Sequence, residues 1–207
     1  MATEHTSIDP GALEARVRYE LLTACVQPRP IALVSTLGAD GTANLAPFSF
    51  FMAGGTEPAS VMVSATLGAG GARKDTLRNI EETGEFVVNL VDRAMAPGMN
   101  EVSYGFPSEF DEWTVSGFHR VPSSVVAPPR VAESPVQFEC RLHQVVRHGD
   151  SIGSANYVVG EVVRVHCRAD LWDGTRLAAD SFRPIARLGG SQYLDTHSLE
   201  IFSLPRP

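Results

Sequence analysis

The chain has 207 residues, of which 43% are hydrophobic and 20% charged, a composition that allows a sizeable folded core and excludes wholesale disorder. Its formal net charge of −7 argues against a nucleic-acid backbone or an anionic membrane as the main partner, because either would need a basic surface. No segment has the apolar length needed to cross a bilayer, and the first residues carry no apolar signal-peptide core. We therefore expect a cytoplasmic protein with a short mobile start at residues 1–11.

The cysteines and histidines predict no metal site. Cys25, Cys140 and Cys167 lie far apart and form no C-x-x-C pair, so we expect small buried thiols in a reducing compartment. None of the six histidines has the helical i, i+4 spacing of a zinc protease. The acidic cluster at 109–112 is interpreted as a solvated loop without a catalytic role.

The first third of the chain predicts a helix followed by a β-hairpin. Apolar residues recur every fourth position within 11–22, which indicates a short amphipathic helix. The apolar run at 31–35 and its partner at 42–46 are joined by the turn Asp40-Gly41, a strong local hairpin signal. One edge of a sheet is therefore expected to form locally.

The rest of the chain adds strands and one more helix. A short helix is predicted over 74–84, where Asp75 suits the first turn and Gly84 suits the stop. Further strands are predicted at 60–66, 85–91, 136–146 and 157–166, and loops at 94–135. Many strands, few helices and no second β-α-β unit predict a mainly β fold, a single β-barrel domain over 1–207 with a few short helices.

Two segments carry the chemistry of a binding site. In the segment 44–51, Pro47 cannot donate to a sheet ladder, so backbone amides around it are expected to face a planar ligand with polar edges. The segment 68–76 combines glycines, two cations and a hydroxyl at a helix start, a combination that binds a phosphate monoester. Its alternative is a mobile glycine loop with surface cations. Ser35 and Thr36 at a strand end offer further hydroxyls.

Four ordered motifs then carry a family resemblance. The segments 29–36, 44–49, 74–80 and 84–90 resemble, in order and spacing, the flavin reductase-like proteins that include flavoredoxin. The later segments 134–140, 159–162 and 187–193 extend the match, so that the resemblance covers most of the chain, from about residue 19 to 193.

The resemblance implies an FMN-binding split barrel that works as a homodimer, with the flavin at or near the subunit interface. It implies phosphate and ribityl contacts at Ser35, Thr36, Lys74 and Thr76, and an isoalloxazine platform at Asn44, Ala46, Pro47, Phe48 and Ser49. It adds Ser64, Arg73, Arg187 and Tyr193 as further cofactor contacts, Tyr193 having the equal alternative of an ordinary barrel aromatic.

Two function classes follow from this resemblance. The first is an FMN-dependent oxidoreductase that passes electrons to an acceptor or to free flavin, with the ring carrying the chemistry and no catalytic residue assigned. The alternative is a non-catalytic flavin- or haem-binding carrier, although haem would demand an axial ligand in a pocket. The histidine of a D-H pair found in several nicotinamide-using reductases of this group is replaced within 154–157, which predicts slow direct reduction by NADH or NADPH. Asn156 remains available there for a hydrogen bond to the flavin edge or a substrate, and the loop 94–135 is expected to shape the acceptor pocket.

Overall fold

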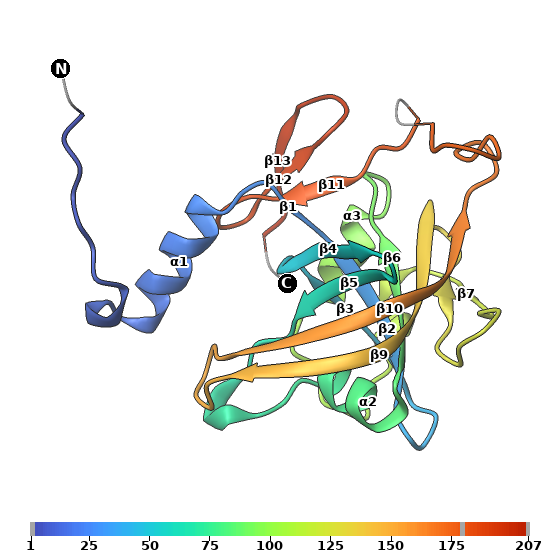
Figure 1. The fold of residues 1–207 in the computed structure, drawn as a ribbon, viewed down its shortest axis with the longest axis horizontal. Helices are drawn as coiled ribbons and strands as arrows, with labels where there is room; N and C mark the ends of the chain where they lie inside the picture. The colour runs from blue at the N-terminus through green and yellow to red at the C-terminus, as the bar shows by residue number, and fades with distance from the viewer. Residues whose placement is uncertain (1–2, 179–180, 206–207) are drawn as a thin grey trace.

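The computed structural model describes residues 3–178 and 181–205 (Figure 1). Its helices are η1 (Pro10–Ala12), α1 (Ala15–Cys25), η2 (Ala69–Gly71), α2 (Asp75–Thr83), α3 (Ala96–Glu101) and α4 (Trp113–Ser116). Its strands are β1 (Arg29–Pro30), β2 (Ala32–Leu37), β3 (Ala43–Phe48), β4 (Phe51–Thr56), β5 (Ala59–Ser64), β6 (Glu85–Leu90), β7 (Arg120–Val121), β8 (Arg130–Val131), β9 (Val136–His148), β10 (Ala155–Cys167), β11 (Ile185–Arg187), β12 (Gln192–Asp195) and β13 (Ile201–Ser203).

The main sheet has seven strands in the order β3-β2-β6-β9-β10-β5-β4, and each neighbouring pair is antiparallel. The long β9–β10 hairpin crosses the front of the molecule in Figure 1. Smaller sheets join β1, β11, β12 and β13, and β7 with β8. The expected mainly β fold with a few short helices is therefore confirmed. Within the described residues, no helix is both long and apolar enough to span a membrane.

Two apolar cores lie on opposite faces of the β2–β3 hairpin. The barrel core gathers side chains from β2, β5, β6 and β10, including Val34, Val63 and Phe86, and the sheet curves around it. The lateral core gathers Leu33 and Leu45 with residues of α3, α4 and β12. Because Leu33 and Val34 are successive residues of one strand, their side chains enter different cores.

Helix α2 closes one end of the barrel core. Leu77 and Ile80, one turn apart, are both buried in that core. The helix ends at Gly84, which takes the left-handed conformation with φ 74°. Residues with a side chain rarely adopt this conformation. The helix predicted over 74–84 is confirmed, with Lys74 as its N-cap residue and Gly84 as its C-cap residue.

Several sequence-based expectations differ from the structure. The β3 strand does not stop before Pro47 but continues to Phe48, because β3 is an edge strand whose outward-facing groups need no ladder partner. Strands β4 and β11–β13 were not predicted, since β4 contains Gly54-Gly55 and the others are three or four residues long. Cys25 is exposed at the end of α1 rather than buried.

The predicted loop region 94–135 contains α3, α4 and a segment that we call the strap, residues 122–131. The strap lies on the face of β2, β6 and β9 that carries Ser35 and Glu139, which share one row of the sheet through the register. Ser35 Oγ donates to the carbonyl oxygen of Pro129 at 2.6 Å, and Glu139 accepts from the N–H groups of Ser124 and Val125 at 2.6 and 2.7 Å. Buried polar side chains therefore fasten the strap to the sheet.

Glu139 is fully buried, and its Oε1 lies 2.6 Å from Nε2 of His166. Burial by itself would raise the pKa of the Glu139 carboxyl, but the strap amides and the His166 ring outweigh it, and the pKa lies below its ordinary 4.5. A carboxylate with a depressed folded-state pKa stabilises the fold above its unfolded pKa, and this contribution is lost as pH falls toward the folded pKa.

We predict that Glu139→Gln lowers the free energy of unfolding by about 2–4 kcal/mol at neutral pH. The Gln oxygen can accept only a weaker, neutral hydrogen bond, and the Gln NH2 group would face a strap N–H that also donates. Below about pH 4.5 the difference from the unmodified protein should shrink, since protonation removes the same charge. Urea denaturation at several pH values measures both effects. Glu133→Gln is the control, because Glu133 pairs with the exposed His119 and should cost less than about 1 kcal/mol. Equal losses in both variants would contradict the role given to Glu139.

Candidate functional site

Three of the predicted cofactor residues meet in one buried group of polar side chains. Asn44 Nδ2 donates to Oγ1 of Thr76 at 2.9 Å and to Oγ1 of Thr36 at 3.3 Å. Asn79 Nδ2 donates to the same Thr36 oxygen at 3.0 Å. We call these four residues the polar cluster. Asn79 was not among the predicted site residues, although its position three residues after Thr76 places both on one face of α2.

The polar cluster fixes α2 against β2 and β3. All four side chains are buried, and they hydrogen-bond to one another instead of facing open solvent. Asn44 and Asn79 also line a cavity of ≈470 Å³, whose charged lining is mostly acidic: Asp40, Asp75, Glu82 and Glu109, with Arg78 the basic exception. An anion is disfavoured on that side of α2.

The N-terminal end of α2 brings a cation and an aromatic ring together. Lys74 is the N-cap residue, and among the residues that the structure describes no side chain caps this helix start. The first backbone N–H groups of a helix have no partner within the helix. Lys74 Nζ lies 5.4 Å from the centroid of the Phe48 ring. Lys74 is also the only lysine in the sequence. Arg73 turns away to Glu81, at 2.6 Å, and Arg147 binds the same carboxylate.

The glycine loop before α2 is held by the β9–β10 hairpin. Gly70 and Gly71 have φ angles of 64° and 75°, which side chains rarely adopt, and a Cβ on Gly71 would lie 3.0 Å from the Asp150 carbonyl oxygen. Asn156 is buried and donates its side-chain amide to the Ala65 carbonyl oxygen at 3.0 Å. The structure thus engages Asn156 with the loop backbone. The loop is shaped by its glycines and supported by the hairpin.

Ser64 supplies a test of whether a polar ligand fits here. It ends β5, and its backbone N–H donates to the Phe50 carbonyl oxygen at 2.8 Å, which ties it to the segment after Pro47. The Ser64 side chain is buried, and within the described residues its hydroxyl has no hydrogen-bond partner. Such a hydroxyl is costly unless a further group binds it. The end of β5, beside the segment after Pro47, therefore fits a ligand with polar groups.

The remaining predicted residues lie elsewhere. Ala46 and Pro47 are half-buried in β3, near Phe48. Ser35 points to the opposite face of β2 and binds the strap, so the structure does not bring it to the polar cluster. Arg187 and Tyr193 pair across β11 and β12, where the Arg187 guanidinium lies 4.5 Å from the Tyr193 ring. Their predicted contact with a flavin stays a prediction.

Glu112 corrects the interpretation of the acidic cluster as a solvated loop. Its side chain is buried and accepts a hydrogen bond from the Leu45 backbone N–H at 3.3 Å, next to Asn44 in β3. Burial raises the pKa of the Glu112 carboxyl, with Asp75 and Asp111 adding to the effect. Sequence gave no sign of this, because the burial arises from α4 packing against β3.

Comparisons with known proteins agree with this geometry. The family model described as "Flavin reductase like domain" matches residues 26–185. The structure is similar to that of nitrilotriacetate monooxygenase component B from Bacillus cereus, with 31% identity, a TM-score of 0.87 and coverage of 100% of this chain and 98% of that one. It is also similar to 2-nitrobenzoate 2-nitroreductase from Pseudomonas fluorescens, with 34% identity, a TM-score of 0.83 and coverage of 97% and 96%.

A solved structure from Shewanella frigidimarina with a split barrel domain aligns with a TM-score of 0.77 at 21% identity, covering 96% of each chain, and bears on the fold alone. The strand order around the barrel core, the four motifs of the sequence and the family match over 26–185 lead to one assignment. The chain belongs to the flavin reductase-like domain family and has the split-barrel fold.

Proposed function

We propose that this protein is an FMN-dependent oxidoreductase that passes electrons through bound FMN to an acceptor or to free flavin. The observation that carries the proposal is the meeting of Lys74 with the Phe48 ring at the start of α2. The buried Ser64 hydroxyl at the end of β5, which has no partner within the described residues, supports it. The similar Bacillus cereus and Pseudomonas fluorescens proteins are, by name, a monooxygenase component and a nitroreductase, which supports oxidoreductase chemistry.

The phosphate of FMN would bind at the start of α2. A helix N-terminus carries partial positive charge and unpartnered N–H groups, and Lys74 adds a full charge at the same place. A terminal phosphate monoester concentrates about −1.5 to −2 charge on one group. The internal diphosphate of FAD spreads a similar charge over two phosphates, so a single helix start with one lysine favours FMN. Ser64 would offer its hydroxyl to the ribityl chain or the phosphate.

The ring would lie along the end of β3. Because β3 is an edge strand, every second backbone group between Ala46 and Ser49 faces away from β2 and can meet the polar edge of a flavin. Bound FMN supplies the electron-carrying ring, and the protein holds and orients it. Asn44 and Thr76 act indirectly in this proposal, because the polar cluster sets the position of α2.

The histidines give the alternative of a haem carrier little support. Haem iron needs an axial ligand. His5, His119, His143, His148 and His197 are exposed, and His166 is engaged with Glu139 at the strap. A flavin carrier without turnover remains the alternative to test against the enzyme.

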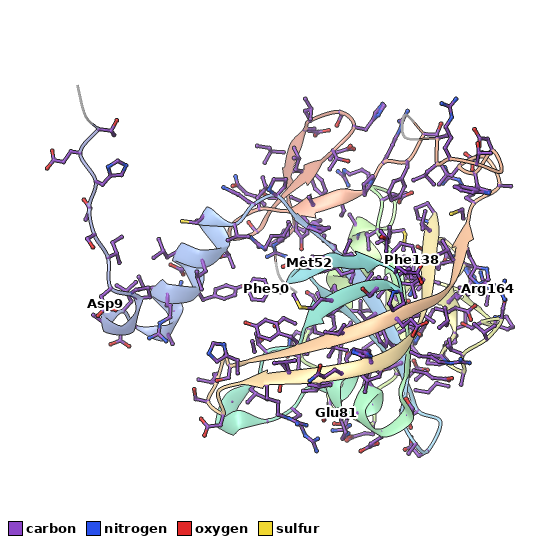
Figure 2. The ribbon with its side chains drawn as sticks, viewed as in Figure 1. Asp9, Phe50, Met52, Glu81, Phe138 and Arg164 are labelled. Atoms are coloured by element: carbon purple, nitrogen blue, oxygen red, sulfur yellow. The ribbon has the colours of Figure 1, made fainter. Side chains whose placement is uncertain are left out.

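We predict that the purified protein binds FMN and that Lys74→Ala weakens the affinity about ten-fold or more, because a charge-assisted hydrogen bond to the phosphate is lost. Arg164→Ala is the charge-matched control, since Arg164 is exposed on β10, away from α2 (Figure 2). Fluorescence titration with FMN measures both affinities. Unchanged FMN affinity in Lys74→Ala would remove Lys74 from the site.

Redox cycling of the FMN-loaded protein distinguishes an enzyme from a flavin carrier. Dithionite or a reduced protein donor should bleach the flavin absorbance rapidly, and added acceptor or free flavin should restore it over many cycles. NADH and NADPH should bleach it slowly, well below a typical enzymatic turnover of about 10 per second. Stopped-flow spectroscopy at 450 nm follows each step. A protein that releases FMN without repeated turnover would be a carrier.

We predict that Ser64→Ala stabilises the flavin-free protein by up to about 1 kcal/mol and yet weakens FMN binding, because the variant removes a buried hydroxyl that only the ligand satisfies. Ser134→Ala is the control, since the Ser134 hydroxyl donates to the Leu90 carbonyl oxygen at 2.7 Å and its loss should destabilise the protein. Thermal unfolding with and without FMN measures both variants. Destabilised flavin-free Ser64→Ala would show that the hydroxyl has a protein partner.

We also propose a homodimer. Helix α1 stands away from the barrel in Figure 1, and it exposes Val17 and Leu22 with Val26 at its C-terminal end, each 47–60% accessible, apolar surface that a second copy would cover. Light scattering should give twice the chain mass of 22.3 kDa. Leu22→Glu should shift the protein toward the monomer, whereas Val165→Glu, an equally exposed apolar position on β10, should not. A monomeric mass for the unmodified, FMN-loaded protein would refute the dimer.

A further inference from the structure

A second cleft, of ≈600 Å³, lies between α1 and the turn that joins β11 to β12, and we call it the α1 cleft. Its lining includes the charged residues Arg16, Glu20, Arg29 and Arg187, together with Tyr19. It shares no lining residue with the acidic cavity beside the polar cluster.

The charge of the α1 cleft is opposite to that of the protein as a whole. The one acidic residue of its lining, Glu20, pairs with Arg16 at 2.8 Å on the exposed side of α1. Within the described residues, neither Arg29 nor Arg187 lies within 4.0 Å of a carboxylate oxygen. Two guanidinium groups are thus left without a counterion, in a chain whose net charge is −7.

Arg29 is buried at the base of the α1 cleft, with 4% of its surface exposed. Its N–H groups donate to the carbonyl oxygens of Thr23, Val26 and Leu188 at 2.6 to 2.9 Å, so neutral groups alone balance its charge. Burial, with a smaller repulsive contribution from Arg187, lowers the pKa of Arg29. An anion entering the cleft would offset both the cost of burying the Arg29 charge and its repulsion by Arg187.

Arg187, which also lines the α1 cleft, is held in place by neighbouring groups. Its guanidinium lies over the Tyr193 ring and donates to the Tyr193 hydroxyl and the Gly190 carbonyl oxygen. Because neutral partners orient the group, its charge stays available to a ligand in the cleft. A guanidinium fixed in this way binds planar oxyanions with little loss of side-chain entropy.

The α1 cleft meets the segment that we propose to hold the flavin ring. Arg29 Nε lies 3.4 Å from Oγ of Ser49, and Arg29 Cζ lies 5.9 Å from the centroid of the Phe50 ring. Tyr19 of α1 approaches the same ring, with centroids 6.4 Å apart, and Figure 2 shows Phe50 reaching from the barrel toward α1. A molecule anchored at the two arginines would therefore extend toward Ser49.

We propose that the α1 cleft is the subsite for the reactant that exchanges electrons with the flavin, and that Arg187 binds a carboxylate or phosphate group of that reactant while the buried charge of Arg29 adds to the attraction. The inference rests on the proposed flavin function. The oxyanion has two chemical sources, the phosphates of a nicotinamide dinucleotide donor and the carboxylate of an organic acid acceptor. Both present oxygen atoms that can accept from the Arg187 N–H groups not used by Tyr193 and Gly190.

Calorimetric titration of the full-length, FMN-loaded protein with two probes tests the proposal, using sodium benzoate for the carboxylate source and NADP⁺ for the phosphate source. At low salt at least one probe should bind, and Arg187→Gln should weaken its affinity about ten-fold. Glu20→Gln should strengthen the affinity, because it removes the one carboxylate of the cleft lining. Arg176→Gln, remote and paired with Asp173, should change nothing.

The probe that binds identifies the source of the oxyanion. Absence of binding by both probes, or binding that is indifferent to Arg187→Gln and Glu20→Gln, would overturn the proposal. FMN affinity is measured in parallel, and a loss in Arg187→Gln as large as the loss for the probe would assign the cleft to the flavin instead. Failure of the unmodified protein to bind FMN at all would refute the proposed function, and a separate titration without FMN would still report whether the cleft takes an anion. Circular dichroism confirms that each variant is folded.

Discussion

The hydrogen bond from Asn44 to Thr76 is the contact on which the arrangement of the site depends. It joins an edge strand to the first turn of α2, and Thr36 and Asn79 complete the same buried cluster. Buried amides and hydroxyls are costly without partners, so this cluster admits few other positions of the helix. The direction of the α2 N-terminus, and with it the place of Lys74, is a consequence of packing inside the barrel end.

The two faces of the sheet at β2 hold two different elements, the strap and α2. On one face Ser35 and Glu139 hold the strap, and on the other Thr36 and Asn44 hold α2. The adjacent residues Ser35 and Thr36 thus contact different elements, since successive side chains of a strand point to opposite faces of the sheet. The alternation predicts that the hydroxyls of Ser35 and Thr36 diverge, and the register of β2 against β6, and of β6 against β9, shows that Ser35 shares its face with Glu139.

Local signals made much of the fold predictable. The hairpin around Asp40-Gly41, the helix that stops at Gly84 and the long β9–β10 pair all follow from turn residues and periodic apolar positions. Short strands such as β11 carry too few residues to show a period, and the burial of Glu112 depends on contacts distant in sequence. For the candidate site, the sequence motifs predicted the glycine loop and Lys74. The ion pair between Arg73 and Glu81, which are eight residues apart, could be recognised only from the folded structure.

Because Lys74 is the only lysine in the sequence, proteolysis can report on the unwinding of α2. Lys74 stands between the glycine loop and α2, so a protease that cuts only after lysine has a single target in the whole chain. Cleavage requires an extended backbone of several residues around the target bond, and here the following residues are helical and carry the buried Thr76. The appearance of two fragments divided at Lys74 would therefore record how often α2 unwinds from the barrel, at the one point of the chain where a ligand phosphate is proposed to restrain it.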